Sequence, residues 1–284
     1  MNIKSLYDKR EISPKEREYL ENYHIEQFFR PSVSSDIAAF TIENTETENY
    51  RKEEERKLKI LLVKRGQHPF RGYWALPGGF LQEEESIEEC ALREIREETN
   101  IQPISMKPIG VFSECGRDPR GRIISHAFTS IIHDGTREAV GGDDASQAEW
   151  FAISLQEKDG LHYLEMEKDE IRLTAILQEK NHRFGYRQFE ILDSCGLAFD
   201  HAAIITTALM SLRRDVWDFE MLFDFLPEKF TLNHLQKVQE QILDQPVLTA
   251  NFRRKIAPLV EETKEHVTGA GHRPARLYTR RKIR

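Results

Sequence analysis

Short apolar segments along the chain alternate with polar stretches and predict a sheet on both sides of one acidic helix. Strands are predicted at Ser34–Ile42, Lys59–Arg65, Ile109–Ser113, Arg122–Ile132 and Glu149–Ile153. The charged stretch Glu43–Lys57 is predicted to be an exposed excursion between the first two. Gly160–Leu192 alternates apolar and polar residues, which indicates extra hairpin strands or a dimerisation edge. Leu197–Arg213 is strongly apolar and is predicted to be the helix that closes the first domain.

The acidic helix is predicted to begin at Ile87. Ser86 and Glu89 have the S-x-x-E spacing of a capping box, which marks the start of a helix. The apolar residues that follow at helical spacing are expected to form its buried stripe: Ile87, Ala91, Leu92 and Ile95.

Three glutamates lie beside this stripe. At about 100° per residue, Glu94, Glu97 and Glu98 fall within an arc of roughly 100°. Carboxylates crowded next to a buried face repel one another, so either some take up protons or a hard divalent cation neutralises them. Arg93 is placed to pair with Glu97 or Glu89. On charge alone, a solvated helix face is the simpler interpretation.

The spacing of these residues favours the cation. Gly79, Glu85, Arg93, Glu94, Ile95, Glu97, Glu98 and Ile101 fit the pattern G-x5-E-x7-R-E-U-x-E-E-x-G-U, where U is a bulky apolar residue. This pattern resembles the Nudix box, the signature of the Nudix hydrolase family. One position departs, because Asn100 stands where the family has glycine. Asparagine is the next most tolerant residue for a left-handed helix end, so we expect the metal site to survive.

The resemblance implies an α/β fold, the Nudix α/β/α sandwich with a mixed sheet. It also implies that Glu94, Glu97 and Glu98 bind Mg²⁺ or Mn²⁺ together with the carbonyl of Gly79, and that Arg93 supports them. The ion would neutralise the pyrophosphate and lower the pKa of an attacking water. The general base is expected among these glutamates or at Asp143 or Asp144, which lie in a later loop, although those aspartates can also cap a turn.

Three further segments, RGYWALPGGFL, GRDPRGRIIS and GGDDASQAEWF, resemble the ADP-ribose pyrophosphatase branch of the family. That branch binds adenine with an aromatic residue and phosphate with arginines. The candidate substrate-binding residues are therefore Arg65, Phe70, Tyr73, Trp74, Arg117, Arg120, Arg122, Asp143 and Asp144. The expected substrate is ADP-ribose or a related nucleoside diphosphate derivative. By contrast, His201, a single histidine on an apolar helix, is expected to be structural.

Length and composition limit the number of domains and the cellular compartment that we expect. Its 284 residues are long enough for two domains, and 39% are hydrophobic. No apolar run approaches the roughly 18 residues that cross a bilayer, and the first residues do not have the pattern of a signal peptide. The three cysteines, Cys90, Cys115 and Cys195, have no metal-ligand spacing and are expected to be free thiols in a cytoplasmic protein.

Charge singles out the C-terminal part. Residues 251–284 hold ten Lys and Arg against three Asp and Glu, a net charge of +7, while the rest carries −14. This part is predicted to contain a helix capped by Thr231, a basic helix capped by Thr249, and a hairpin joined by TGAGHRP. Such an order is typical of a winged helix-turn-helix, whose second helix enters the major groove of DNA. A small basic dimerisation or structural domain is the alternative.

The residues expected to contact double-stranded DNA are Thr249, Asn251, Arg253, Arg254, Lys255, Arg273 and Arg276. A Nudix domain followed by LAFDHAAII, LPEKFTLNHLQ, NFRRK and RPARLY resembles the Nudix-related transcriptional regulators. The expected organisation is an N-terminal extension (1–33), a Nudix domain (34–215) and a winged-helix domain (225–284).

Two functions are expected from this organisation. The first is metal-dependent hydrolysis of a nucleoside diphosphate derivative, linked to transcriptional regulation. The alternative is an ADP-ribose-sensing repressor of NAD or sugar metabolism genes with little or no hydrolysis. A homodimer is expected, since helix-turn-helix proteins commonly bind two half-sites.

Overall fold

The computed structural model describes residues 12–45, 55–133, 145–180, 187–267 and 275–281. The chain divides into two compact units, Met1–Pro31 and Ser32–Arg284. In the first unit, helix α2 (Pro14–Glu21) is capped by the Ser13 side chain, and a 3-10 segment, η1 (Ile25–Gln27), follows it.

Within the described residues of the second unit, ten strands form one mixed sheet with the order β10-β9-β8-β7-β2-β1-β6-β5, in which β3 pairs with β2 and β4 pairs with β1. The strands are β1 (Ser32–Thr45), β2 (Glu55–Arg65), β3 (Trp74–Ala75), β4 (Gly78–Phe80), β5 (Ser105–Phe112), β6 (Ile123–Ile131), β7 (Ala145–Lys158), β8 (Leu161–Lys168), β9 (Ile171–Lys180) and β10 (Gln188–Cys195). β1 and β6 are parallel, whereas the other pairs are antiparallel. Part of the predicted excursion, Glu43–Lys57, is therefore strand.

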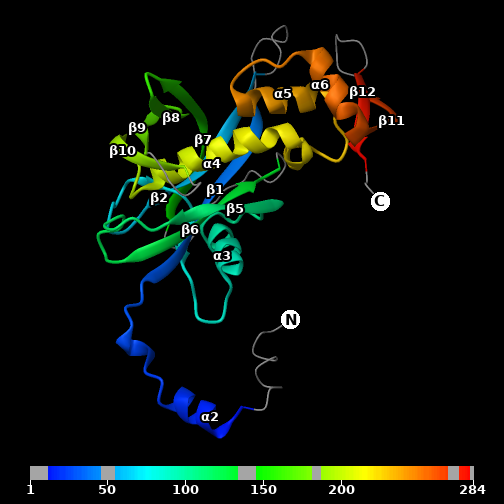
Figure 1. Cartoon of the computed structure of the whole chain (residues 1–284). Helices are drawn as coiled ribbons and strands as arrows, with labels where there is room; N and C mark the ends of the chain where they lie inside the picture. The colour runs from blue at the N-terminus through cyan, green and yellow to red at the C-terminus, as the bar shows by residue number, and fades with distance from the viewer. Residues whose placement is uncertain (1–11, 46–54, 134–144, 181–186, 268–274, 282–284) are drawn as a thin grey trace. The chain divides into compact units, whose positions relative to one another are not determined.

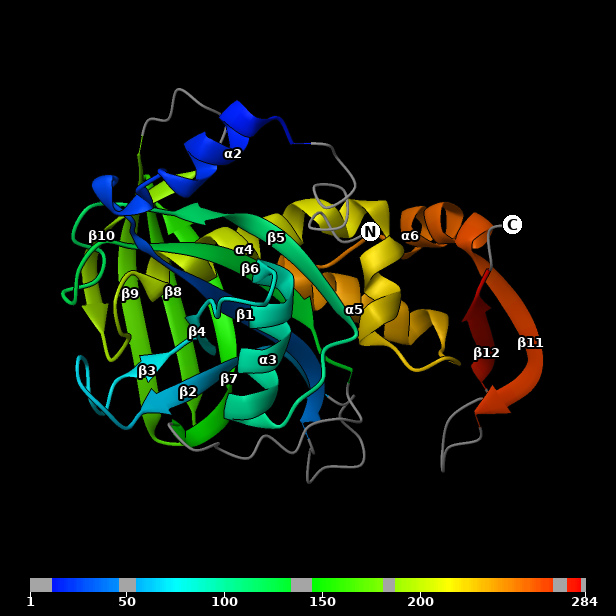
Figure 2. The same cartoon turned by 90° about the horizontal axis from the view of Figure 1, so that it is seen from below.

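The alternating side chains of β1 go to two separate cores. Ala38 and Phe40 belong to the core on the face covered by helices α4 (His201–Asp215) and α5 (Leu232–Leu243), whereas Ile37 and Ala39 belong to the core under helix α3 (Ile87–Thr99). A strand buried on both faces has apolar residues at consecutive positions, which explains the continuous apolar run in the sequence. Figure 2 shows α3 on one side of the sheet and α4 on the other. The predicted α/β/α sandwich is confirmed.

Helix α3 (Ile87–Thr99) begins with the predicted capping box, since Ser86 and Glu89 each bind the backbone N–H of the other. Its buried side differs from the prediction. Leu92 is 37% exposed, and the buried positions are Cys90, Ala91, Ile95 and Thr99. The helix ends at Asn100 in the left-handed conformation, with φ of 56°, as the departure from glycine predicts.

Helix α4 (His201–Asp215) starts later than the sequence pattern predicts. Leu197 instead pairs with Trp74, and Phe199 has a left-handed φ of 52°, which stops a helix from extending through it. Two 3-10 segments follow, η2 (Val216–Asp218) and η3 (Glu220–Phe225). In the described part of the chain, no helix is long and apolar enough to cross a membrane.

The C-terminal elements form the predicted winged helix-turn-helix. They are α5 (Leu232–Leu243), α6 (Thr249–Ile256), η4 (Ala257–Leu259) and the antiparallel strands β11 (Val260–Val267) and β12 (Ala275–Arg280). Figure 1 shows α5 beside α4, with α6 following it toward the two strands. The domain boundaries predicted at residues 33, 215 and 225 stay predictions, because the second unit continues without a division from Ser32 to the end.

One prediction concerns the end of α3. We expect Asn100→Ala to lower the free energy of unfolding by about 1 kcal/mol, because alanine has no side-chain group to offset the left-handed conformation. Asn100→Gly should leave the free energy unchanged or raise it. Urea unfolding followed by circular dichroism measures both, and equal values for the two variants would contradict the argument.

Candidate functional site

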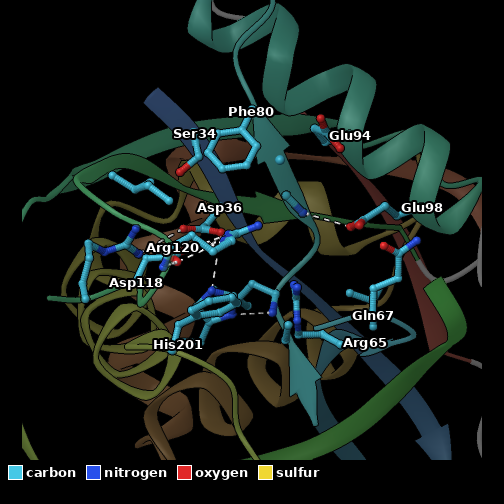
Figure 3. A pocket seen from close by; sticks show the side chains of 18 of the residues that line it. Ser34, Asp36, Arg65, Gln67, Phe80, Glu94, Glu98, Asp118, Arg120 and His201 are labelled. Atoms are coloured by element: carbon cyan, nitrogen blue, oxygen red, sulfur yellow. Dashed lines mark hydrogen bonds and ion pairs between the residues drawn. The ribbon is translucent and has the colours of Figure 1, made fainter. Parts of the chain in front are cut away.

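A cavity of about 490 Å³ opens where the loop of β4 meets α3. In Figure 3, Glu94 and Glu98 lie on one side of this cavity and Asp118 and Arg120 on the opposite side. The two glutamates are one helical turn apart, so α3 presents both to the same space. Glu98 also accepts a hydrogen bond from the backbone N–H of Gly78, at 3.0 Å.

Arg93 holds the acidic residues in place. Its guanidinium forms two hydrogen bonds to the Glu85 carboxylate, at 2.9 and 2.7 Å, and binds Glu94 at 2.7 Å. It also donates to Glu97 at 3.1 Å, which is one of the two pairings expected from the sequence. Glu89 caps the helix start instead. The Glu85 partner was missed, although both residues belong to the same motif.

Burial makes the cavity carboxylates hard to ionise. It raises the pKa of Glu98 to about 8, with the neighbouring charge of Glu94 acting in the same direction. Burial also raises the pKa of Glu94, despite its contact with Arg93. Glu97 has a 61% exposed side chain and does not line the cavity. Burial therefore disfavours the ionised form of both carboxylates. A hard divalent cation bound between them would stabilise that ionised form.

Among the residues that the structure describes, no three His, Cys, Asp or Glu side chains lie close enough together to hold a metal ion. Two carboxylates nevertheless fit Mg²⁺, which keeps several waters and takes substrate phosphate oxygens as further ligands. The backbone of Gly79 also passes close to Glu94, since a Cβ on Gly79 would lie 2.3 Å from Glu94 Oε1. The residues present therefore fit a divalent cation.

A second charged network forms another wall of the cavity. Arg117 is nearly buried and binds Asp200, at 2.8 and 2.6 Å, and Asp36, at 3.4 Å. His201 accepts the backbone N–H of Leu76 at Nδ1, and its Nε2 lies 3.6 Å from Asp36. Burial lowers the pKa of His201, so the neutral ring is favoured. The prediction of a structural His201 missed that it also lines the cavity.

The predicted substrate residues separate into two groups. Those that line the cavity are Arg65, Arg117 and Arg120. Arg65 and Arg120 stack on the ring of Phe199, with distances of 4.8 and 5.4 Å to its centroid, so this aromatic residue, which the sequence did not single out, orders both cations.

The other group lies elsewhere. Trp74 is in the core against Phe151, so it is not available to a substrate. Phe70 packs on Phe199, and Tyr73 packs on Phe70; neither lines the cavity. Arg122 donates to the carbonyl of Ser113. Asp143 and Asp144 lie outside the described residues.

The basic helix α6 forms a candidate DNA interface. Phe252 and Ile256 are buried, which leaves the exposed side of α6 to Thr249, Asn251, Arg253, Arg254 and Lys255. Arg276 lies on β12 and pairs with Glu262, while Arg273 lies outside the described residues. Thr249 is not the helix cap, which corrects the prediction. Leu248 is the N-cap, and the Thr249 hydroxyl accepts a hydrogen bond from Gln236.

Comparisons with known proteins match both halves of the chain. The family model described as "NUDIX domain" matches residues 50–168, and "NrtR DNA-binding winged helix domain" matches residues 222–279. An ADP-ribose pyrophosphatase of Methanocaldococcus jannaschii is 42% identical over 118 residues, which cover 42% of this chain and 69% of that protein.

Two relatives extend over most of the chain. The ADPR responsive transcriptional repressor NtrR of Acinetobacter baylyi is 26% identical over 268 residues, which cover 93% of this chain and 87% of that protein. The crystal structure of Shewanella oneidensis NrtR complexed with a 27mer DNA superposes with a TM-score of 0.60 at 27% identity, covering 88% of this chain and 93% of that one.

The raised pKa of Glu98 predicts a pH dependence of stability in EDTA. The pKa is about 8 in the folded state and about 4.5 when unfolded, so folding favours the protonated carboxyl. Its contribution is fully present below pH ~4.5 and is lost as pH rises to about 8, on the order of a few kcal/mol. We expect Glu98→Gln to remove this part of the slope in urea unfolding at pH 5 to 8.5. An identical slope in the variant would contradict the assignment.

Proposed function

The chain belongs to the Nudix family, and on this premise we propose that it hydrolyses ADP-ribose or a related nucleoside diphosphate derivative. The observation that carries the proposal is the cavity itself, where Glu94 and Glu98 face Arg120 across a space lined by further arginines. The carboxylates suit a cation, and the arginines suit phosphate oxygens, as a diphosphate substrate requires. The similarity to an ADP-ribose pyrophosphatase supports this choice of substrate.

The residues would divide the work as follows. Nudix hydrolases need a divalent metal ion, and we propose that it is Mg²⁺ or Mn²⁺. When bound, the ion would neutralise charge on the diphosphate and lower the pKa of a water molecule. Glu94 and Glu98 would hold the ion with the backbone of Gly79, and Glu97 stays a predicted ligand. Arg93 would position Glu94. The base that takes the proton from water is one of these glutamates, or Asp143 or Asp144.

Arg65 and Arg120 would bind the phosphates, because Phe199 orders both guanidinium groups beside the cavity. Water attacks one phosphorus atom of the anhydride, and the bridging oxygen leaves with the other phosphate. ADP-ribose and water then give AMP and ribose 5-phosphate.

The winged helix supports a second proposed activity, binding of double-stranded DNA in transcriptional regulation. The repressor of Acinetobacter baylyi and the DNA complex of the Shewanella oneidensis protein both resemble this chain over most of its length. We further propose a homodimer that binds two half-sites, and a cytoplasmic location. The alternative is a sensor that binds ADP-ribose with little hydrolysis.

The two proposed activities should be separable by mutation. We expect Glu98→Gln to lower the rate of AMP formation from ADP-ribose and Mg²⁺ by about a thousandfold, since a cavity carboxylate is lost. DNA binding by the same variant should stay unchanged. Chromatographic detection of AMP measures the rate, with Glu88→Gln, an exposed residue of the same helix, as the control. If wild-type protein forms no AMP, the enzymatic proposal fails and the sensor remains.

The converse variant tests the interface of α6. Arg254→Ala should weaken binding to the chain's own upstream DNA and reduce the slope of log K against log [salt] by about one unit, because one phosphate contact is lost. Hydrolysis should stay at the wild-type rate. Fluorescence anisotropy at several salt concentrations gives the slope. Binding that does not depend on salt in the wild-type protein would contradict a DNA interface.

A further inference from the structure

The cavity between the loop of β4 and α3 (the first cavity) contains a carboxylate that the proposed hydrolysis does not use. Asp118 lies in the loop between β5 and β6, and only 4% of its side chain is exposed. It lines the cavity beside Arg120, one of the two proposed phosphate ligands, as Figure 3 shows. A carboxylate at this place would repel a diphosphate unless its own charge is compensated.

Arg120 supplies the compensation through an ion pair with two contacts. Its Nε lies 3.0 Å from Oδ1 of Asp118, and its Nη2 lies 2.7 Å from Oδ2. The same Oδ1 accepts the backbone N–H of Arg120 at 2.9 Å. Burial would raise the pKa of Asp118, but the hydrogen bonds and the charge of Arg120 lower this pKa overall, so the carboxylate is ionised at neutral pH. Asp118 therefore fixes both the backbone and the guanidinium of Arg120.

Two aromatic rings restrict the guanidinium further. Its central carbon lies 5.1 Å from the centroid of the Phe80 ring and 5.4 Å from that of the Phe199 ring, and both rings line the first cavity. A guanidinium has two edges with paired donors, and Asp118 occupies the edge formed by Nε and Nη2. The other edge, formed by Nη1 and the second N–H of Nη2, makes no hydrogen bond to the residues that the structure describes.

This second edge is accessible to a ligand. The Arg120 side chain is 43% exposed, whereas Asp118 is buried, so solvent reaches the guanidinium from the side away from Asp118. On that side Arg120 faces Glu94 and Glu98 across the first cavity. The free edge is therefore on the side where a diphosphate held by a cation would lie.

Asp118 also offsets the repulsion between two cations. Arg65 stacks on the same Phe199 ring, at 4.8 Å from its centroid. Burial and the positive charge of Arg120 lower the pKa of Arg65, and the negative charge of Asp118 acts in the opposite direction. Without this carboxylate, the two guanidinium groups would repel each other across the ring, and the more exposed Arg120 would be free to turn away.

We propose that Asp118 is a positioning residue, which holds Arg120 with its free edge presented to a phosphate group of the substrate. The proposal rests on the proposed hydrolysis of a nucleoside diphosphate derivative. Two parallel N–H groups on one edge match two oxygens of one phosphate, so the direction of that edge determines the affinity. Because Asp118 neutralises the charge of Arg120, the arginine contributes oriented hydrogen bonds more than net positive charge. Asp118 acts only through Arg120 and is not itself a catalytic residue.

A double-mutant cycle tests this role through binding of ADP-ribose to the full chain. Titration calorimetry in EDTA measures the affinity without turnover. We expect Asp118→Asn to weaken binding about tenfold, because an amide cannot accept both N–H groups of the edge. Arg120→Ala should weaken it at least as much, since the unpaired Asp118 then repels the phosphates. The double variant should bind no more weakly than Arg120→Ala. Equal losses from Asp118→Asn in both backgrounds would mean that Asp118 only supports the fold, and would overturn the proposal.

Arg120→Lys gives a second test, which does not depend on the folding of a variant at the buried Asp118. Lysine keeps the positive charge but has no planar fork, so the affinity for ADP-ribose should again fall about tenfold. Unchanged affinity would show that charge alone matters, which contradicts positioning. Asp215→Asn is the matched control, because Asp215 pairs with Arg214 and Lys107 and does not line the first cavity. This variant should bind ADP-ribose within about twofold of wild type.

The same proteins separate the positioning role from the hydrolysis. If the wild-type protein binds ADP-ribose but forms no AMP with Mg²⁺, the hydrolysis is refuted, and the cycle of affinities still decides the role of Asp118. If AMP is formed and Asp118→Asn binds ADP-ribose as tightly as wild type, the positioning role alone is refuted. A wild-type protein that neither binds ADP-ribose nor forms AMP would overturn both proposals.

Discussion

The first cavity depends on how closely the loop of β4 passes between β1 and α3. A Cβ on Gly78 would lie 2.2 Å from the carbonyl oxygen of Ser35, and one on Gly79 would lie 2.3 Å from Glu94 Oε1. A side chain at position 78 would collide with the backbone of β1, so only glycine allows the loop to take this path, whereas a side chain at position 79 would displace the Glu94 carboxylate. Because the loop lies this close to α3, the backbone N–H of Gly78 can donate a hydrogen bond to Glu98. Because the loop comes so near to α3, its backbone and the two carboxylates face one space.

Local chemistry was predictable from the sequence. The capping box at Ser86 and the left-handed end at Asn100 depend on neighbouring residues, and the structure has both. Glu94 and Glu98 followed from spacing on one helix. The prediction for Leu92 was wrong because the helical period does not show on which side the buried stripe of α3 ends. The stripe includes Cys90 and leaves Leu92 partly exposed. In α6, Thr249 looked like a cap, but its hydroxyl accepts from Gln236, a residue of the preceding helix.

Contacts between distant segments were not predictable. Asp36, Arg117 and Asp200 form one network only because β1 lies beside β6 and the chain returns to the same place at the start of α4. The hydrophobic pattern of the sequence does not show that these three residues are in contact. Trp74 shows the converse, since it resembled a loop aromatic available for stacking. Its backbone pairs with both β2 and Leu197, which draws the ring into the core.

Helix α4 connects the first cavity to the winged helix. At its start, the His201 ring accepts the N–H of Leu76 and faces Asp36 in the cavity wall. Near its end, roughly 20 Å away at 1.5 Å per residue, Arg213 donates to the carbonyls of Leu155 in the sheet and Ile242 in α5. The contacts of α4 therefore run from the wall of the first cavity to α5. If a ligand in the cavity changes the affinity for DNA through these contacts, linkage requires DNA to change the affinity for that ligand by the same factor.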